Sequence, residues 1–148
     1  MHGNAADRAH LALVDDDTHS ARMMIRMLLA HGAPSVDWLA DAEVAEATLR
    51  ANATRTGAEL PALVLVDLKS SSRATADFIS RLRAAPGASS LLIAALAPSL
   101  ERAYREPLLV AGADAVFQRH ADANAYRREA ASIVSFWVQH QRLEAVGT

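Results

Sequence analysis

Acidic residues follow two apolar segments of the chain and are the clearest candidates for chemistry. Asp15–Asp17 come directly after the apolar run 11–14, and Asp67 comes directly after a second run, 62–66. Neighbouring carboxylates repel one another unless a cation holds them together. Carboxylate oxygens suit Mg²⁺, which shares its coordination with phosphate. Because a carboxylate beside such a cation can attack a phosphoryl group and form an acyl phosphate, these acids predict a phosphoacceptor site.

One cation is the candidate for neutralising the transferred group: Arg119, which follows the last apolar run, 115–117. Lys69, the only lysine in the chain, either projects over the acidic site or lies free on the surface. A cation at such a site stabilises the negative charge that develops on the transferred oxygens. The planar guanidinium of Arg119 supplies positive charge, although arginine does not substitute freely for lysine.

Five apolar runs predict the strands that must position these residues: 11–14, 36–40, 62–66, 91–96 and 115–117. Continuously apolar runs of this length are typical of strands that are covered on both faces of a parallel sheet. The segments between them have helical spacing, so the order is strand–helix repeated five times. That order predicts an α/β fold, a doubly wound parallel sheet with helices on both faces. In such a fold the functional site lies beyond the carboxyl ends of the strands.

The expected helices have identifiable ends and buried stripes. The segment 20–30 is expected to be helical and to stop at Gly32, and the segment 74–83 groups Phe78, Ile79 and Leu82 on one side. Asp122 is expected to cap a long helix. Its apolar stripe consists of Tyr126, Ala130, Ile133, Val134, Trp137 and Val138.

Two further helices carry more specific expectations. Asp41 is expected to cap a helix that carries Val44 and Leu49. Ser99 is expected to cap a segment through Val110, which Pro107 should kink or shorten.

Composition limits the class of protein. The 148 residues fit one domain, with the folded part expected at 10–143, a flexible N-terminus at 1–9 and a tail at 144–148. The net charge of −2 gives no sign of a nucleic-acid or membrane partner. The absence of cysteine excludes disulfides and thiol catalysis. The longest apolar run, Leu91–Ala97, is too short to span a bilayer, and the polar N-terminus lacks a signal core, so a soluble cytoplasmic protein is expected.

The residues at the strand ends resemble the receiver (CheY-like) domain of response regulators. The resemblance covers about 11–138 and rests on the segments 13–17, 63–67, 93–97 and 111–114 and on the spacing between them. It implies a flavodoxin-like sheet with strand order 2-1-3-4-5. It also implies that Asp15 and Asp16 bind Mg²⁺, that Asp67 accepts the phosphoryl group, and that Lys69 lends its backbone carbonyl to the metal.

The chain departs from this family's pattern at the positions that read out phosphorylation. The hydroxyl position is Ala97, the aromatic switch position is Val116, and the lysine position is Arg119, followed by His120 instead of proline. Ala97 cannot donate a hydrogen bond and Val116 has no ring to rotate. Phosphorylation is therefore expected to be read differently, through Arg119, Lys69 or the loop 70–72.

Three functions compete. The leading hypothesis is a phosphoacceptor that receives its phosphoryl group from a histidine kinase or a His-phosphotransfer protein and is not itself an enzyme. The second is a pseudo-receiver, a binding module that signals without phosphorylation. A Mg²⁺-dependent phosphohydrolase is disfavoured because no second acid directly follows Asp67.

The end of the chain suggests protein partners. The residues after the fifth strand are too few for a DNA-binding output domain, so a standalone receiver is expected. Phe136, Trp137 and Val138 weakly resemble the tail of small receivers that partner bacteriophytochrome-type histidine kinases. Phe136 or Trp137 either packs across a homodimer through the C-terminal helix or covers the domain's own core.

Overall fold

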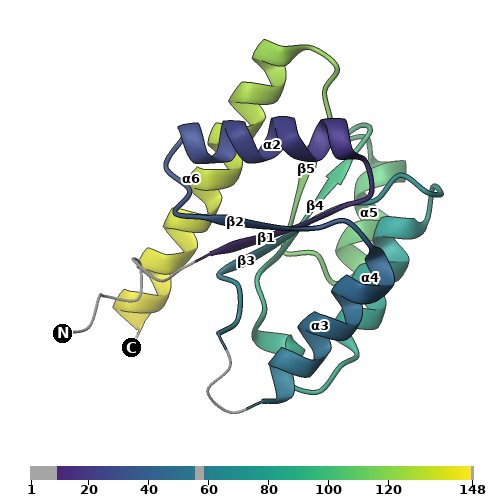
Figure 1. Ribbon diagram of the computed structural model, residues 1–148, viewed down its shortest axis with the longest axis vertical. Helices are drawn as coiled ribbons and strands as arrows, with labels where there is room; N and C mark the ends of the chain where they lie inside the picture. The colour runs from purple at the N-terminus through teal and green to yellow at the C-terminus, as the bar shows by residue number, and fades with distance from the viewer. Residues whose placement is uncertain (1–9, 56–58, 148) are drawn as a thin grey trace.

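A five-stranded parallel sheet in the order β2-β1-β3-β4-β5 forms the centre of the computed structural model, which describes residues 10–55 and 59–147 (Figure 1). Its strands are β1 (Leu11–Asp15), β2 (Val36–Leu39), β3 (Leu63–Asp67), β4 (Ile93–Ala97) and β5 (Ala115–Gln118). Every residue of β1, β3 and β4 is buried, because helices cover both faces of these central strands. The predicted strands and their order are confirmed.

The helices form two layers around the sheet. They are α2 (Thr18–Ala30), α3 (Ala42–Thr54), α4 (Ala74–Arg83), α5 (Arg102–Ala111) and α6 (Ala123–Gly147), with a short 3₁₀ turn η1 (Ala88–Ser90). Helices α2 and α6 lie on one face of the sheet, and α3, α4 and α5 lie on the other (Figure 1). Side chains alternate along each strand, so Leu13 and Leu65 pack towards α2 and α6, whereas Val14 and Val66 pack towards the opposite layer.

Helix α3 confirms its predicted cap. The Asp41 carboxylate accepts a hydrogen bond from the Val44 N–H at 2.9 Å. The Val44 side chain is 60% exposed, however, and the buried residues of the helix are Ala45 and Leu49. Residues four apart share a helix face, so Ala45 and Leu49 are buried together. The small alanine side chain contributes little to the apolar pattern of the sequence.

Helix α5 differs from its expected limits. It begins at Arg102, and the Ser99 hydroxyl instead accepts a hydrogen bond from the Glu101 N–H at 3.0 Å, outside the helix. Pro107 lies inside the helix, which continues to Ala111. A proline removes one hydrogen bond to the preceding turn, and here the helix tolerates that loss and ends at Gly112, whose φ of +122° suits glycine.

The other predicted helices are confirmed with small changes. Helix α2 ends before Gly32, which has a positive φ of +102°, and α4 spans the predicted residues with Phe78, Ile79 and Leu82 buried. Asp122 accepts from the Ala125 N–H at 2.9 Å at the start of α6. That helix continues to Gly147, beyond the expected boundary at residue 143. The expected N-terminal segment 1–9 lies outside the described residues. Within the described part of the chain, no helix is both long and apolar enough to cross a bilayer.

Candidate functional site

The parallel pairing of β1 and β3 places two acids side by side at the carboxyl end of the sheet. Asp15 and Asp67 are register partners. Side chains alternate with a period of two, and the preceding residues of the two strands are in register, so both carboxylates project from the same face. Asp15 is 1% exposed and Asp67 is fully buried. Two buried neighbouring carboxylates require compensating positive charge.

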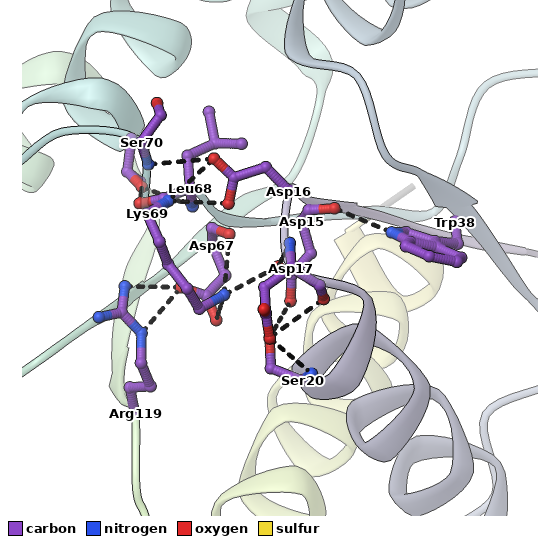
Figure 2. Close-up of polar contacts among 11 residues, drawn as sticks. Asp15, Asp16, Asp17, Ser20, Trp38, Asp67, Leu68, Lys69, Ser70 and Arg119 are labelled. Carbon is purple, nitrogen blue, oxygen red and sulfur yellow. Dashed lines mark hydrogen bonds and ion pairs between the residues drawn. The ribbon is translucent and has the colours of Figure 1, made fainter.

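Two cations supply that charge (Figure 2). The Lys69 ammonium lies 2.8 Å from Asp15 Oδ1 and 3.0 Å from Asp67 Oδ2. Arg119 donates to Asp67 Oδ1 from Nε at 3.0 Å and from Nη2 at 2.7 Å. The Lys69 contact with Asp67 is an ion pair whose direction does not suit a hydrogen bond to Oδ2. The two carboxylates and two cations therefore balance in charge.

The backbone around the sheet edge holds Arg119 in position. Arg119 follows β5, and its N–H donates to the Ala97 carbonyl at 2.7 Å, which extends the pairing of β4 and β5 past the end of β5. The predicted convergence of Asp67 with Arg119 is therefore present. His120, which follows Arg119, pairs with Glu129 of α6 at 2.8 Å.

Asp16 is turned away from the other two acids. One of its oxygens accepts from the Lys69 N–H at 2.9 Å, and the other accepts from the Ser70 N–H at 3.0 Å (Figure 2). These bonds fasten the loop after β3 to the loop after β1. Lys69 thus contacts the acids through its N–H and its ammonium.

Asp15 has further partners that the sequence did not indicate. Its carboxylate accepts from the Asp17 N–H at 2.9 Å and from the Ser20 hydroxyl at 3.0 Å. Its backbone carbonyl accepts from the Trp38 indole at 2.9 Å. Burial raises the pKa of Asp15 above its usual value of 3.8, and the Lys69 hydrogen bond opposes that rise. No spacing in the sequence links Ser20 or Trp38 to the acids, so only the folded chain shows these contacts.

Hydrogen bonds at the start of α2 act on Asp17. Its carboxylate caps the helix by accepting from the Ser20 N–H at 2.9 Å. This bond lowers the pKa of Asp17 below 3.8, since it stabilises the ionised form.

Ala97, which stands where the resemblance implies a hydroxyl, is apolar and borders a pocket. Ala97 is 1% exposed at the end of β4. It lines a pocket of about 260 Å³ between the loop after β3 and helix α5, together with Leu68, Tyr104, Leu108 and Arg119. Val116, at the aromatic switch position, packs partly buried against the α3–α5 core.

A threonine that the sequence analysis passed over fixes the loop after β3. The buried Thr75 hydroxyl accepts from the Leu68 N–H at 3.0 Å and lies 3.3 Å from the Leu68 carbonyl, to which it donates. It holds the residue between Asp67 and Lys69, and so sets where the loop leaves the strand. Its helical position gave no hint of this role.

The arrangement of the acids does not fit a divalent metal. Carboxylate oxygens are the right donors for Mg²⁺. However, Asp15 and Asp67 direct oxygens at the Lys69 ammonium, and Asp16 directs both of its oxygens at backbone N–H groups. Among residues 10–55 and 59–147, no three histidine or acidic side chains are arranged to hold a metal ion.

Comparison with solved structures shows several receivers with this arrangement of strands and helices. The phosphorylated cyanobacterial phytochrome response regulator RcpA matches with a TM-score of 0.73 and 19% identity, over 88% of this chain and 94% of that one. A response regulator in red light signaling of R. palustris matches with a TM-score of 0.69 and 18% identity, over 87% and 93%. The Mn²⁺-bound form of response regulator Rcp1 matches with a TM-score of 0.72 and 17% identity, over 87% and 94%.

These likenesses show that the chain has the fold of response-regulator receiver domains, and they confirm the predicted CheY-like architecture. The chain spans nearly the whole length of each of these three structures. No family model matches the sequence. No curated protein matches it either.

Proposed function

We propose that this chain is a standalone receiver of a two-component system and that Asp67 accepts a phosphoryl group from a histidine kinase or a His-phosphotransfer protein. The observation that supports this role is the placement of Asp67 at the carboxyl end of β3, between two cations and beside Asp15. A receiver fold alone does not imply function. The proposal therefore depends on this group of side chains.

The proposed step is an in-line phosphoryl transfer. One oxygen of the ionised Asp67 carboxylate forms a bond to phosphorus, and the bond from phosphorus to the donor's imidazole nitrogen breaks. The imidazole keeps the electron pair of the broken bond and takes up a proton from solvent. The products are the Asp67 acyl phosphate and neutral histidine. Arg119 and Lys69 are placed to pair with the phosphoryl oxygens, where positive charge stabilises the transition state.

Access to Asp67 requires movement of at least one of these two cations. Asp67 is fully buried, whereas the side chains of Lys69 and Arg119 are 25% and 28% exposed. They lie between the carboxylate and solvent and pair with its oxygens. A phosphoryl donor must therefore displace at least one of them, and the displaced cation then has a phosphoryl oxygen as its new partner. This exchange of partners gives the site a way to report phosphorylation without a hydroxyl at Ala97.

The expected partner is a kinase of the bacteriophytochrome type, in the cytoplasm. This rests on the structural likeness to a cyanobacterial phytochrome response regulator and to a response regulator in red light signaling of R. palustris. A homodimer through α6 remains a proposal. Trp137 packs within the chain's own core and Phe136 is partly buried against Phe117, with ring centroids 5.9 Å apart.

A second candidate, a pseudo-receiver that binds partners without phosphorylation, is favoured by one observation. The Asp67 carboxylate is fully buried and both its oxygens already have cationic partners. If these pairs never open, Asp67 is a structural acid and the surface of the domain does the signalling.

An intact-mass measurement separates the two candidates. The wild-type chain, Asp67→Asn and the matched control Asp77→Asn, which changes an exposed acid of α4, are incubated with acetyl phosphate and Mg²⁺. One added phosphoryl group on wild type and Asp77→Asn, absent from Asp67→Asn, supports the phosphoacceptor. An adduct that persists in Asp67→Asn contradicts it. Absence of any adduct, also after incubation with a phosphorylated His-phosphotransfer protein, supports the pseudo-receiver.

A further inference from the structure

The Lys69 ammonium lies at the centre of a cage of three oxygens. Its distances are 2.8 Å to Asp15 Oδ1, 3.0 Å to Asp67 Oδ2 and 3.3 Å to the Asp67 carbonyl oxygen (Figure 2). An ammonium has three N–H donors and no acceptor. Lys69 donates to Asp15 Oδ1 and to the Asp67 carbonyl oxygen and forms an ion pair with Asp67 Oδ2, so it bridges the two acids from neighbouring strands.

The backbone of Lys69 is fixed so that its side chain turns back over the acids. Both oxygens of Asp16 bind consecutive N–H groups, those of Lys69 and Ser70. Thr75 holds Leu68 on the other side of Lys69. Residues on both sides of the lysine are therefore anchored, and its side chain extends across Asp67 to Asp15. The third acid of the group serves to position the lysine and does not complete a metal site.

The Lys69 ammonium lies between the Asp15 and Asp67 carboxylates, where a metal ion that bridged them would also have to lie. Lys69 and Arg119 already balance the two negative charges. A divalent ion would have to remove the ammonium from two carboxylates, and the displaced lysine would leave three oxygen contacts. Adding two positive charges to a balanced site without that displacement places like charges a few ångströms apart, which is unfavourable.

We propose that Lys69 is a built-in cation that takes the place of a divalent metal between Asp15 and Asp67 and excludes such metals from the site. The inference deepens the proposed function and rests on it only for the assignment of Asp67 as the reacting group. The site then needs no bound metal ion to hold the two acids together, because Lys69 supplies the positive charge. Phosphoryl acceptance by Asp67 then does not depend on the supply of metal.

Metal binding to lysine variants tests the proposal without any phosphodonor. Mn²⁺ is titrated into wild type, Lys69→Gln, Lys69→Arg and the double variant Asp15→Asn/Lys69→Gln, and bound Mn²⁺ is measured by electron paramagnetic resonance. Lys69→Gln should bind at least about tenfold more tightly than wild type, a difference that this titration resolves readily. Lys69→Arg should resemble wild type because it keeps a cation. The double variant should lose the gain, which locates the metal at Asp15. Equal binding by wild type and Lys69→Gln, or no binding by Lys69→Gln, overturns the proposal.

A second measurement uses the wild-type chain, so it does not depend on whether Lys69→Gln folds. Because Lys69 is the only lysine, its acetylation by an amine-specific reagent can be followed by peptide mass. The rate should be unchanged by millimolar Mg²⁺ and should rise in Asp15→Asn, where one ion-pair partner is lost. A rise in the wild-type rate with Mg²⁺ shows that metal displaces the ammonium and overturns the inference. Neither measurement depends on phosphorylation of Asp67, so the two proposals can fail separately.

Discussion

Arg119 binds a single oxygen of Asp67 through two of its nitrogens, with Nε at 3.0 Å and Nη2 at 2.7 Å. Hydrogen bonds to a charged partner are among the stronger ones in proteins. Removal of the guanidinium leaves a fully buried carboxylate oxygen without its donor. Arg119→Ala should therefore lower the free energy of unfolding by about 1–3 kcal/mol, measured by urea denaturation at neutral pH.

A double-mutant cycle with Asp67→Asn isolates this pair from other effects of the arginine. In the Asp67→Asn background the buried charge is gone, so Arg119→Ala should cost clearly less than in wild type. Additive losses of stability would contradict the assigned pairing and would mean that Arg119 acts through its other contacts.

The pocket beside Ala97 predicts that a hydroxyl is tolerated at residue 97 and not at residue 95, two positions earlier in β4. Ala97 and Ala95 lie on the same face of β4 and both are buried. Only Ala97 lines the pocket of about 260 Å³. Ala95→Ser buries a hydroxyl in an apolar core, at a cost of about 1–3 kcal/mol if the hydroxyl finds no partner. Ala97→Ser should cost less, as measured by urea denaturation, because its hydroxyl opens on the pocket. Equal losses would show that the pocket does not accommodate the hydroxyl.

The raised pKa of Asp15 predicts a pH-dependent contribution to stability. Below the unfolded value of 3.8 the carboxyl is protonated in both states. As pH rises from 3.8 towards the higher pKa of the folded state, Asp15 loses its proton in the unfolded chain but keeps it in the folded one. Over this interval the free energy of unfolding falls. The contribution of Asp15 is therefore greatest in acid and is lost as pH rises through the folded pKa. The stability of wild type relative to Asp15→Asn should fall over that interval.

This comparison uses a difference between two proteins, so the titration of groups that they share largely cancels. Urea denaturation of both chains at a series of pH values above and below 3.8 provides the measurement. A difference that rises with pH would mean that the Lys69 contact outweighs burial at Asp15.

The fold was predictable because its signals are local and periodic. Apolar runs ending in Asp15 and Asp67 placed both acids at one edge, since parallel strands end together, and the run before Arg119 brought a cation to the same edge. The direction of the Lys69 side chain was not predictable. It depends on the bonds from Asp16 to consecutive backbone N–H groups, a tertiary contact between two loops that no periodicity encodes.

The details of the helices that the sequence did not predict have a similar cause. In an alanine-rich helix such as α3 the buried stripe is weak, so the sequence does not distinguish Ala45, which is buried, from Val44, which is exposed. Ser20 has the residue type of an ordinary helix start, and its hydroxyl contact with Asp15 at 3.0 Å is visible only in the folded chain. Such contacts arise from packing geometry and not from residue type.

Gly112 and Gly32 form a matched pair for testing a close backbone approach. Both have a positive φ, +122° and +102°, which costs an L-residue about 1–3 kcal/mol. At Gly112 an added Cβ would also lie 2.5 Å from Arg83 Cγ, whereas at Gly32 nothing lies within 4 Å. Arg83 also donates to the Gly112 carbonyl at 2.9 Å.

Gly112→Ala should therefore destabilise the protein more than Gly32→Ala, because it adds a clash to the backbone strain and disturbs Arg83. Thermal unfolding of the two variants compares them directly. Similar melting temperatures would show that the Arg83 side chain moves aside at little cost.

Trp137 tests whether α6 serves the core or an interface between two copies. The residue is 5% exposed and packs in the core formed by α2, α6 and the sheet. Truncation of a large buried aromatic side chain costs about 3–5 kcal/mol, so Trp137→Ala should show a large loss in urea denaturation while the mass of the folded protein in sedimentation stays that of wild type. Phe136→Ala is the comparison, since Phe136 is only partly buried on the neighbouring position. A small loss of stability in Trp137→Ala, together with a halved sedimentation mass, would instead place Trp137 across a homodimer.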